Sequence, residues 1–196
     1  GYTGMTPADF VRYVRGIAEE NQFPFEHIIL GGDHLGPSVW QTEPEESAMQ
    51  KAEALIRNYV KAGFVKIHLD CSMRLGDDPQ DVPDVEVSAQ RAAQLAKAAE
   101  TSHVEGFPMP RYVIGTEVPT PGGATGHEES VSVTKVEDVE QTIQVTREAF
   151  LRAGLASAWD RVVGVVVQPG MEFGDDFVLE YRPEKAKASS RFIENQ

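Results

Sequence analysis

Short apolar runs alternate along this chain with segments of helical periodicity, and this alternation restricts the possible fold more than any other feature. The expected strands are residues 27–31, 64–69, 111–115 and 161–168. The expected helices are residues 6–20, 43–61, 85–101 and 136–153, with a last helix that begins at Pro183. Near-continuously apolar strands that alternate with helices, at a spacing of roughly 40 to 50 residues, are typical of a parallel sheet. The sequence therefore predicts an α/β fold.

Two parallel architectures fit this pattern, an open doubly wound sheet and a (β/α)8 TIM barrel. Nucleotide-binding open sheets carry G-x-G-x-x-G or G-x-x-x-x-G-K-[ST] at a strand-to-helix turn. This sequence has neither motif, so the barrel is favoured and no nucleotide cofactor is expected. A complete barrel has eight strands in about 250 residues. We therefore expect a single barrel domain over 1–196 that supplies about four β/α units and is incomplete at both ends, with active-face loops at 76–83 and 119–126.

The acidic composition narrows the classes of partner. Eighteen Lys and Arg residues against 31 Asp and Glu residues give a formal net charge of -13, which repels nucleic-acid phosphates and anionic lipid head groups. The longest apolar stretch, 162–167, is too short to cross a bilayer, and no basic-then-apolar leader opens the sequence. The single cysteine, Cys71, agrees with a reducing compartment. We therefore expect a cytoplasmic protein with no nucleic-acid or membrane partner.

Polar side chains follow the expected strands, at the edge where the ligand-binding groups of parallel α/β proteins converge. After the first strand, the motif GGDHLGP at 31–37 places an acid, Asp33, beside an imidazole, His34. The other expected site residues are Asp70, Ser72, Glu117 and Gln168. Carboxylates and imidazoles from neighbouring strands can bind a divalent cation, or act as acid and base in proton transfer. The spacing alone leaves both chemistries open.

Structural interpretations of the same residues stand beside the functional ones. Asp33 and His34 could form a capping and turn pair, but two titratable groups directly after two glycines favour function. Asp70 could bind backbone N–H groups at the start of its loop, and Cys71 could be a small buried hydrophobic residue. His68 has apolar neighbours in the middle of its expected strand, so we expect a hydrogen-bonded core residue there.

Blocks of sequence at 1–7, 31–37, 40–41, 62–73, 112–124 and 165–174 occur in a fixed order. Together they resemble the GatZ/KbaZ-type family, whose members accompany D-tagatose-1,6-bisphosphate aldolase and are also labelled tagatose-6-phosphate kinases. The family is distantly similar to metal-dependent class II aldolases, which are (β/α) barrels. The resemblance implies that Asp33 is the proton-transfer residue and His34 a zinc ligand. It also implies that Glu117 is a carboxylate that binds the metal or contacts a metal ligand. The strand ending at Gln168 offers no histidine, so a zinc site on this chain is expected to be weak or incomplete.

The resemblance also implies a function. We expect an accessory, non-catalytic and stabilising subunit of class II D-tagatose-1,6-bisphosphate aldolase in galactitol, tagatose or N-acetylgalactosamine catabolism. The expected partners are a catalytic aldolase subunit and a sugar phosphate bound by Asp70, Ser72 and Gln168, and a homo-oligomer stays open. The alternative is a stand-alone metal-dependent aldolase or epimerase on a phosphorylated or acidic sugar. A tagatose-6-phosphate kinase fits least, because the sequence has no phosphate loop.

Overall fold

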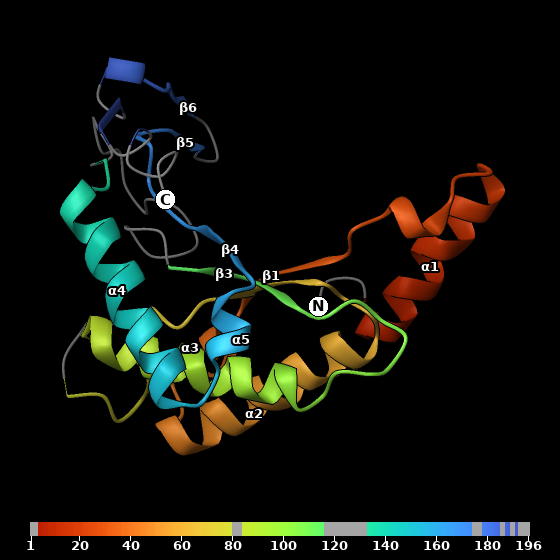
Figure 1. Cartoon of the computed structure of the whole chain (residues 1–196), viewed down its shortest axis with the longest axis horizontal. Coiled ribbons are helices and arrows are strands. Elements are labelled where there is room, and N and C mark those ends of the chain that lie inside the picture. Colours follow the sequence, from red (N-terminus) through yellow and green to blue (C-terminus); the bar gives the residue numbers. More distant parts are fainter. Residues whose placement is uncertain are drawn as a thin grey trace.

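The computed structural model describes residues 4–79, 84–115, 133–173, 178–184, 187–188 and 191. Four parallel strands lie at its centre, side by side in the order in which they follow one another along the chain (Figure 1). The strands are β1 (Gly31–Leu35), β2 (Lys66–Leu69), β3 (Arg111–Ile114) and β4 (Val162–Val165). This parallel sheet with helical connections confirms the predicted α/β class.

Helices connect the strands and cover one face of the sheet. The helices are α1 (Pro7–Glu20), α2 (Glu45–Lys61), α3 (Val85–Glu100), α4 (Val136–Arg152) and α5 (Ala156–Trp159). In Figure 1, α2, α3 and α5 lie on the same side of the sheet, α4 packs beside α3, and α1 stands away from the body at one end. The smaller described elements are η1 (Phe25–His27), η2 (Ser38–Trp40) and an antiparallel hairpin of β5 (Glu172–Phe173) and β6 (Val178–Leu179).

Local sequence signals explain where two of these helices begin. At α1, the Thr6 hydroxyl accepts the Asp9 backbone N–H at 3.2 Å, and the Asp9 carboxylate accepts the Thr6 backbone N–H at 2.9 Å. This reciprocal capping box satisfies two free donors, and Pro7 fits the first helical position because it has no N–H to satisfy. At α3, the Asp84 carboxylate accepts the Glu86 backbone N–H at 3.3 Å.

Side chains alternate along each strand between a face that the helices cover and an open face. In β2, Ile67 and Leu69 are buried in the core between sheet and helices. The alternate residues Lys66 and His68 contact Asp33 on the opposite face. The largest buried side chains of the core include Met49, Ile56, Leu95, Tyr112 and Phe150. The open face therefore collects the ionisable residues of β1 and β2.

The first strand differs from its prediction at 27–31. It begins at Gly31, so the glycines and the acid–imidazole pair belong to the strand itself rather than to a loop after it. The chain before it forms η1 and an extended segment, in which the Leu30 carbonyl accepts the backbone N–H groups of Val65 at 2.9 Å and Lys66 at 3.2 Å. A Cβ on Gly31 would lie 2.8 Å from Lys66 Cδ, so a larger residue here would have to displace the Lys66 side chain that crosses it.

The end of the chain also differs in detail. The fourth strand ends at Val165 rather than at 168, so Gln168 lies beyond the sheet, and the β5–β6 hairpin was not predicted. Residues 183–184, 187–188 and 191 are helical, in agreement with a helix that begins at Pro183. The expected loop at 119–126 lies outside the described residues.

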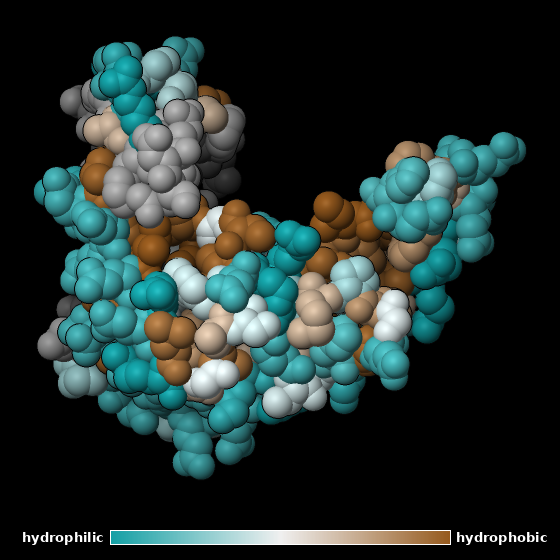
Figure 2. Space-filling model, in the orientation of Figure 1, coloured by the Kyte–Doolittle hydropathy of each residue, from teal (hydrophilic) through white to brown (hydrophobic). Residues whose placement is uncertain are grey.

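The four described strands do not by themselves form a closed barrel. β1 and β4 each have a neighbour on one side only. Figure 2 shows a hollow above the open face of the sheet, with apolar side chains on part of its surface. Exposed large apolar residues include Ile29 and Val163. Within the described part of the chain, no helix has the length and hydrophobicity that a bilayer crossing requires.

Candidate metal centre

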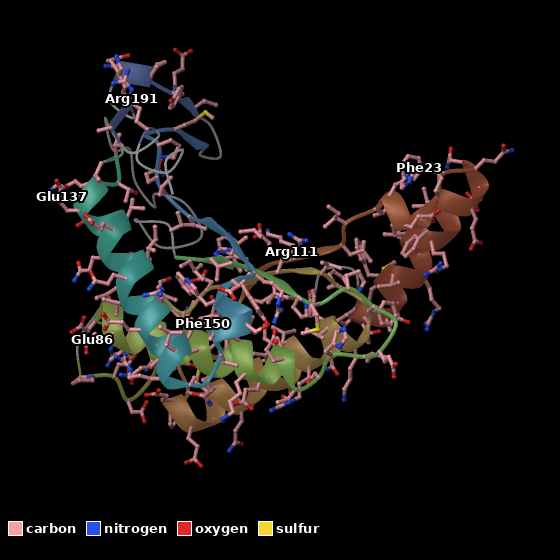
Figure 3. The ribbon with its side chains drawn as sticks, in the orientation of Figure 1. Phe23, Glu86, Arg111, Glu137, Phe150 and Arg191 are labelled. Carbon is pink, nitrogen blue, oxygen red and sulfur yellow. The ribbon has the colours of Figure 1, made fainter. Side chains whose placement is uncertain are left out.

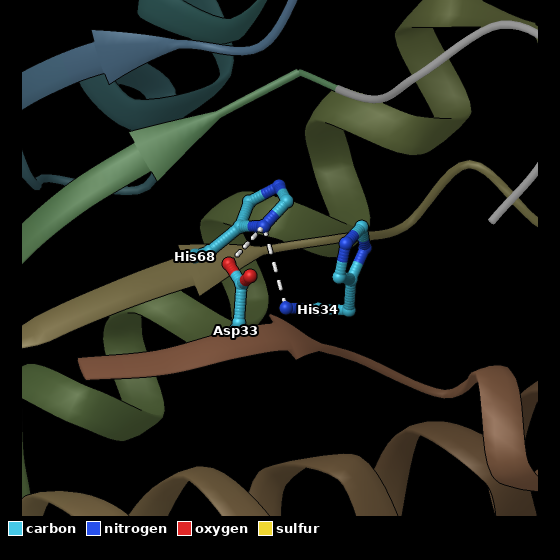
Figure 4. A group of neighbouring side chains, drawn as sticks. All are labelled: Asp33, His34 and His68. Atoms are coloured by element: carbon cyan, nitrogen blue, oxygen red, sulfur yellow. Dashed lines mark hydrogen bonds and ion pairs between the residues drawn. The ribbon is translucent and has the colours of Figure 1, made fainter. Parts of the chain in front are cut away.

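The acid and the imidazole of the GGDHLGP motif share one face because β1 is irregular. Consecutive residues of a regular strand point to opposite faces, yet Asp33 and His34 both lie beside His68 (Figure 4). The register with β2 shifts between Gly32 and Leu35, which marks a β-bulge. His34 has a φ of 47°, in the left-handed region. Such backbone costs of order 1–3 kcal/mol for a residue other than glycine, and a bulge re-aims the side chains around it.

A close contact between two backbones fixes the ends of β1 and β2. A Cβ on Gly36 would lie 1.7 Å from the carbonyl oxygen of Asp70, so only glycine fits there. The Asp70 backbone N–H also donates to the Leu35 carbonyl at 3.2 Å. These contacts place the Asp70 side chain beside His34 although 36 residues separate them in the chain.

A buried carboxylate orients the His34 ring. The Asp70 side chain is fully buried, and its Oδ2 accepts a hydrogen bond from His34 Nδ1 at 2.9 Å. Its Oδ1 accepts the Ser72 hydroxyl at 2.8 Å and the Ser72 backbone N–H at 3.3 Å. Because an ionised carboxylate only accepts, the proton of a neutral His34 ring sits on Nδ1. The other nitrogen, Nε2, then keeps a lone pair for a metal ion or a proton.

The His68 ring is held by backbone groups on both sides. Its Nε2 donates to the Gly115 carbonyl at 3.2 Å, and its Nδ1 lies 3.3 Å from the His34 backbone N–H. The Asp33 Oδ1 atom lies 3.1 Å from the same Nδ1. When Nε2 carries the proton of a neutral ring, Nδ1 accepts the His34 backbone N–H, and its contact with Asp33 Oδ1 joins two acceptors. A positive charge between them, from a proton or a metal ion, makes this contact favourable.

Asp33 is the exposed member of the group. Its side chain is 64% exposed, and its Oδ1 also accepts Lys66 Nζ at 2.8 Å. The hydrogen bond from Lys66 is the largest cause and, together with the contact to His68, outweighs partial burial, so the pKa of Asp33 lies below its usual value. Asp33 therefore stays ionised and is a weak base, because a carboxylate with a lowered pKa binds protons poorly.

Asp33, His34 and His68 could together hold a metal ion. One ligand atom from each of the three lies within 4.8 Å of the others. Two imidazoles and one carboxylate are ligands that zinc and its first-row neighbours accept. The arrangement also suits proton transfer at a bound sugar, because the His34–Asp70 pair leaves one ring nitrogen available.

The structure brings together four of the six residues that the sequence analysis assigned to the site. Asp33, His34, Asp70 and Ser72 form one hydrogen-bonded group with His68 and Lys66. Gln168 is buried elsewhere: its Oε1 accepts the backbone N–H groups of Gly170 at 2.8 Å and Met171 at 3.2 Å in the segment after β4. Glu117 lies outside the described residues.

His68 is the residue that the sequence analysis left out of the site. Its burial agrees with the expected core histidine, but its ring faces Asp33 rather than the helices. A signal was present in the sequence, because Lys66 and His68 alternate with Ile67 and Leu69. Two basic residues at period two indicate a polar strand face, here opposite the acid of the neighbouring strand.

A buried ionic network anchors the loop that follows Asp70 and Ser72. The Arg91 side chain is 1% exposed and donates to Asp78 Oδ1 at 2.6 Å and Oδ2 at 3.0 Å, while Glu45 Oε1 accepts its Nε at 3.2 Å. Desolvation would lower the pKa of Arg91, but the bonds to Asp78 and Glu45 outweigh it and raise that pKa. Arg91 in turn lowers the pKa of Asp78. The network ties the loop to the start of α2 through Glu45 and to the second turn of α3 through Arg91. Figure 3 shows the side chains on this side of the molecule, near the labelled Glu86.

Comparisons with known proteins match this chain over nearly its whole length. A family model described as D-tagatose-1,6-bisphosphate aldolase subunit GatZ/KbaZ-like matches residues 1–196. The chain is similar to a protein of Salmonella dublin called D-tagatose-1,6-bisphosphate aldolase subunit GatZ, with 51% identity over 194 residues, which are 98% of this chain and 46% of that protein. It is also similar to the crystal structure of a probable tagatose 6 phosphate kinase from Sinorhizobium meliloti 1021. That match has a TM-score of 0.85 and 45% identity, and it covers 100% of this chain and 46% of the other. The chain thus spans about half the length of the relatives it matches.

Proposed function

Since the chain belongs to the D-tagatose-1,6-bisphosphate aldolase subunit GatZ/KbaZ-like family, we propose that it acts as an accessory subunit that stabilises a catalytic class II aldolase subunit. The pathway would be the catabolism of galactitol, tagatose or N-acetylgalactosamine. The observation that carries this proposal is the 51% identity, over nearly the whole chain, to a protein named as such a subunit. A cytoplasmic location, expected from the single cysteine and the composition, stays a prediction.

We also propose that the four strands are half of a (β/α)8 barrel, and that residues 1–196 contribute to a single barrel domain. The sequential parallel order β1 to β4 supports this, as does the absence of helices from the open face among the described residues. In a TIM barrel such a face becomes the packed interior, and the carboxyl ends of the strands carry the site. The site on β1 and β2 lies at that end.

The state of Asp33 favours an accessory role over independent catalysis. An aldolase or epimerase needs a base whose pKa lies near the working pH. Asp33 is instead paired with Lys66 and contacts His68, and its pKa is lowered. A carboxylate in this state removes protons from carbon poorly.

The alternative function is a stand-alone metal-dependent aldolase or epimerase on a phosphorylated or acidic sugar. The His34–Asp70 pair supports it, because a carboxylate-oriented imidazole is a common metal ligand. In that function Asp33 would transfer the proton, His34 and Glu117 would bind zinc, and Ser72 would contact the sugar. The buried contacts of Asp70 and Gln168 favour positioning roles for both. A kinase is the third function, and the name of the Sinorhizobium meliloti structure is its only support.

Two activity assays on the same purified protein separate the three functions. The purified chain is tested with zinc for cleavage of D-tagatose 1,6-bisphosphate, alone and with the catalytic aldolase subunit, and for ATP-dependent phosphorylation of tagatose 6-phosphate. We expect no cleavage and no phosphorylation by the chain alone, and a longer half-life of aldolase activity when it is added to the catalytic subunit. Robust cleavage by the chain alone contradicts the accessory role, and ATP-dependent phosphorylation supports the kinase.

A further inference from the structure

We propose that Asp33, His34 and His68 form a divalent-metal site of two imidazoles and one carboxylate that is complete on β1 and β2 and needs no ligand from Glu117. This site goes beyond the aldolase role, because it depends only on contacts between two neighbouring strands. The proposed ligand atoms are Asp33 Oδ1 and His68 Nδ1, which lie 3.1 Å apart, and one ring nitrogen of His34, within 4.8 Å of the ligand atoms of the other two residues. The remaining coordination positions are open to water or to a substrate oxygen.

The distance between two of the ligand atoms fits a metal ion. Zinc binds imidazole nitrogen and carboxylate oxygen at about 2.0–2.2 Å, which places neighbouring ligand atoms about 3.0–3.4 Å apart in octahedral or tetrahedral geometry. The distance from Asp33 Oδ1 to His68 Nδ1 is 3.1 Å. When His68 Nε2 donates its proton to the Gly115 carbonyl, His68 Nδ1 is an acceptor and binds the His34 backbone N–H at 3.3 Å. A metal ion between Nδ1 and Asp33 Oδ1 takes the place of this long hydrogen bond.

The outer contacts of both imidazoles are those of metal-bound histidines. Such histidines donate their second ring N–H to a carboxylate or a backbone carbonyl, which fixes the ring and its tautomer. Asp70 Oδ2 accepts the hydrogen bond from His34 Nδ1 at 2.9 Å, and the Gly115 carbonyl accepts the one from His68 Nε2 at 3.2 Å. A histidine that only fills core space needs neither the bulge nor the left-handed backbone that bring His34 to the group.

The Lys66 ammonium group competes with a metal ion for Asp33 Oδ1. Its ammonium group lies 2.8 Å from Asp33 Oδ1, the atom that would bind the metal. The pair is partly exposed, with side-chain exposures of 35% for Lys66 and 64% for Asp33, so it is a weak pair. A divalent ion displaces the ammonium group, and the charge of Lys66 opposes metal binding. The nitrogen-rich ligand set favours zinc, cobalt, iron or nickel over magnesium and calcium.

Titrations of the full chain with zinc by calorimetry, and with Co²⁺ by visible absorption, test this site. We expect one ion per chain. His68→Gln should weaken binding by at least about 100-fold, and Asp70→Asn should weaken it about 10- to 100-fold, the usual effect of losing an outer partner. Glu117→Gln should bind as the unmodified chain does.

A charge change and a control make the test specific. Lys66→Met keeps an unbranched side chain but removes the charge, and should tighten binding about two- to fivefold. His103→Gln is the matched control, because the ring of that histidine donates to the Phe107 carbonyl at 2.9 Å, in the loop between α3 and β3. It should change nothing.

Several outcomes would overturn the proposal. They are no zinc bound by the unmodified chain, unchanged binding in His68→Gln, loss of binding in Glu117→Gln, or weaker binding in Lys66→Met. Circular dichroism checks that each variant is folded, and Asp33→Asn replaces His68→Gln if the latter is not. Metal binding without any stabilisation of the aldolase refutes only the accessory role, and stabilisation without metal binding refutes only this site.

Discussion

Replacing Asp78 by alanine should cost more stability than any surface charge change, because it leaves a buried guanidinium without its main partner. Asp78 is 10% exposed and Arg91 is 1% exposed. Removing one partner of a buried ion pair costs about 3–5 kcal/mol. Arg91 keeps Glu45 at 3.2 Å, which reduces the cost, whereas the Leu75 backbone N–H loses its acceptor at 2.7 Å, which adds to it. We therefore expect Asp78→Ala to lower the free energy of unfolding by about 3–4 kcal/mol.

Urea unfolding followed by circular dichroism measures this change. The matched control is Glu148→Ala, which removes an exposed pair with Arg152 at 3.7 Å and should change the stability by less than about 0.5 kcal/mol. The replacement of Asp78 and Arg91 together by apolar residues should recover part of the loss, because no charge then stays buried alone. A loss below about 1 kcal/mol in Asp78→Ala would refute the reasoning, since it would mean that water reaches the guanidinium.

The pH dependence follows from the lowered pKa of Asp78. The folded chain holds the ionised carboxylate more strongly than the unfolded chain does, mainly through Arg91. Its contribution to stability is fully present above the unfolded pKa of about 3.9, and it is lost as the pH falls through the lower folded pKa. The difference between the unmodified chain and Asp78→Ala should therefore stay constant from about pH 8 to pH 5 and shrink below about pH 4.

Three further substitutions test other parts of the fold by the same unfolding assay. Gly36→Ala should cost at least about 3 kcal/mol, because its Cβ would lie 1.7 Å from the Asp70 carbonyl oxygen; a milder cost would show that β1 and β2 can separate. Gly16→Ala, in α1 with no atom within 4 Å of the new Cβ, should instead stabilise the chain by about 0.5–1 kcal/mol. Tyr112→Phe should cost about 1.5–3 kcal/mol, because the buried hydroxyl donates to Glu100 at 2.5 Å; no change would mean that this bond contributes nothing.

The helices and most strands of this chain follow directly from its local pattern. The helical periodicity of 6–20, 43–61, 85–101 and 136–153 and the apolar runs 64–69 and 111–115 each produce the element they predict. These signals are local, since a cap or a periodic face involves neighbours a few residues apart. The parallel order of the strands follows from the same information, because helical connections between strands require it.

The first strand shows where local pattern fails. The apolar run 27–30 has the composition of a strand, whereas Gly31 and Gly32 are residues that usually interrupt one. In the structure the Lys66 side chain lies over Gly31, and a Cβ on Gly32 would lie 3.0 Å from Tyr59 Cδ1 of α2. Such close approaches form only when β1 pairs with β2 and packs against α2, and no short window of sequence contains both partners.

The geometry of the candidate metal centre could not be predicted from local sequence either. Asp33 and His34 are adjacent, so an alternating strand would separate them, and only the bulge with a left-handed His34 brings them to one face. That conformation is unfavourable for histidine by itself. The bond from His34 Nδ1 to the buried Asp70 carboxylate and the contact of its backbone N–H with His68 both exist only in this conformation, so they offset the strain. The glycines of GGDHLGP therefore allow close packing around β1. The acid and the imidazole of the same motif contact His68 of β2. His68 belongs to that group because it is the β2 residue that the bulge faces.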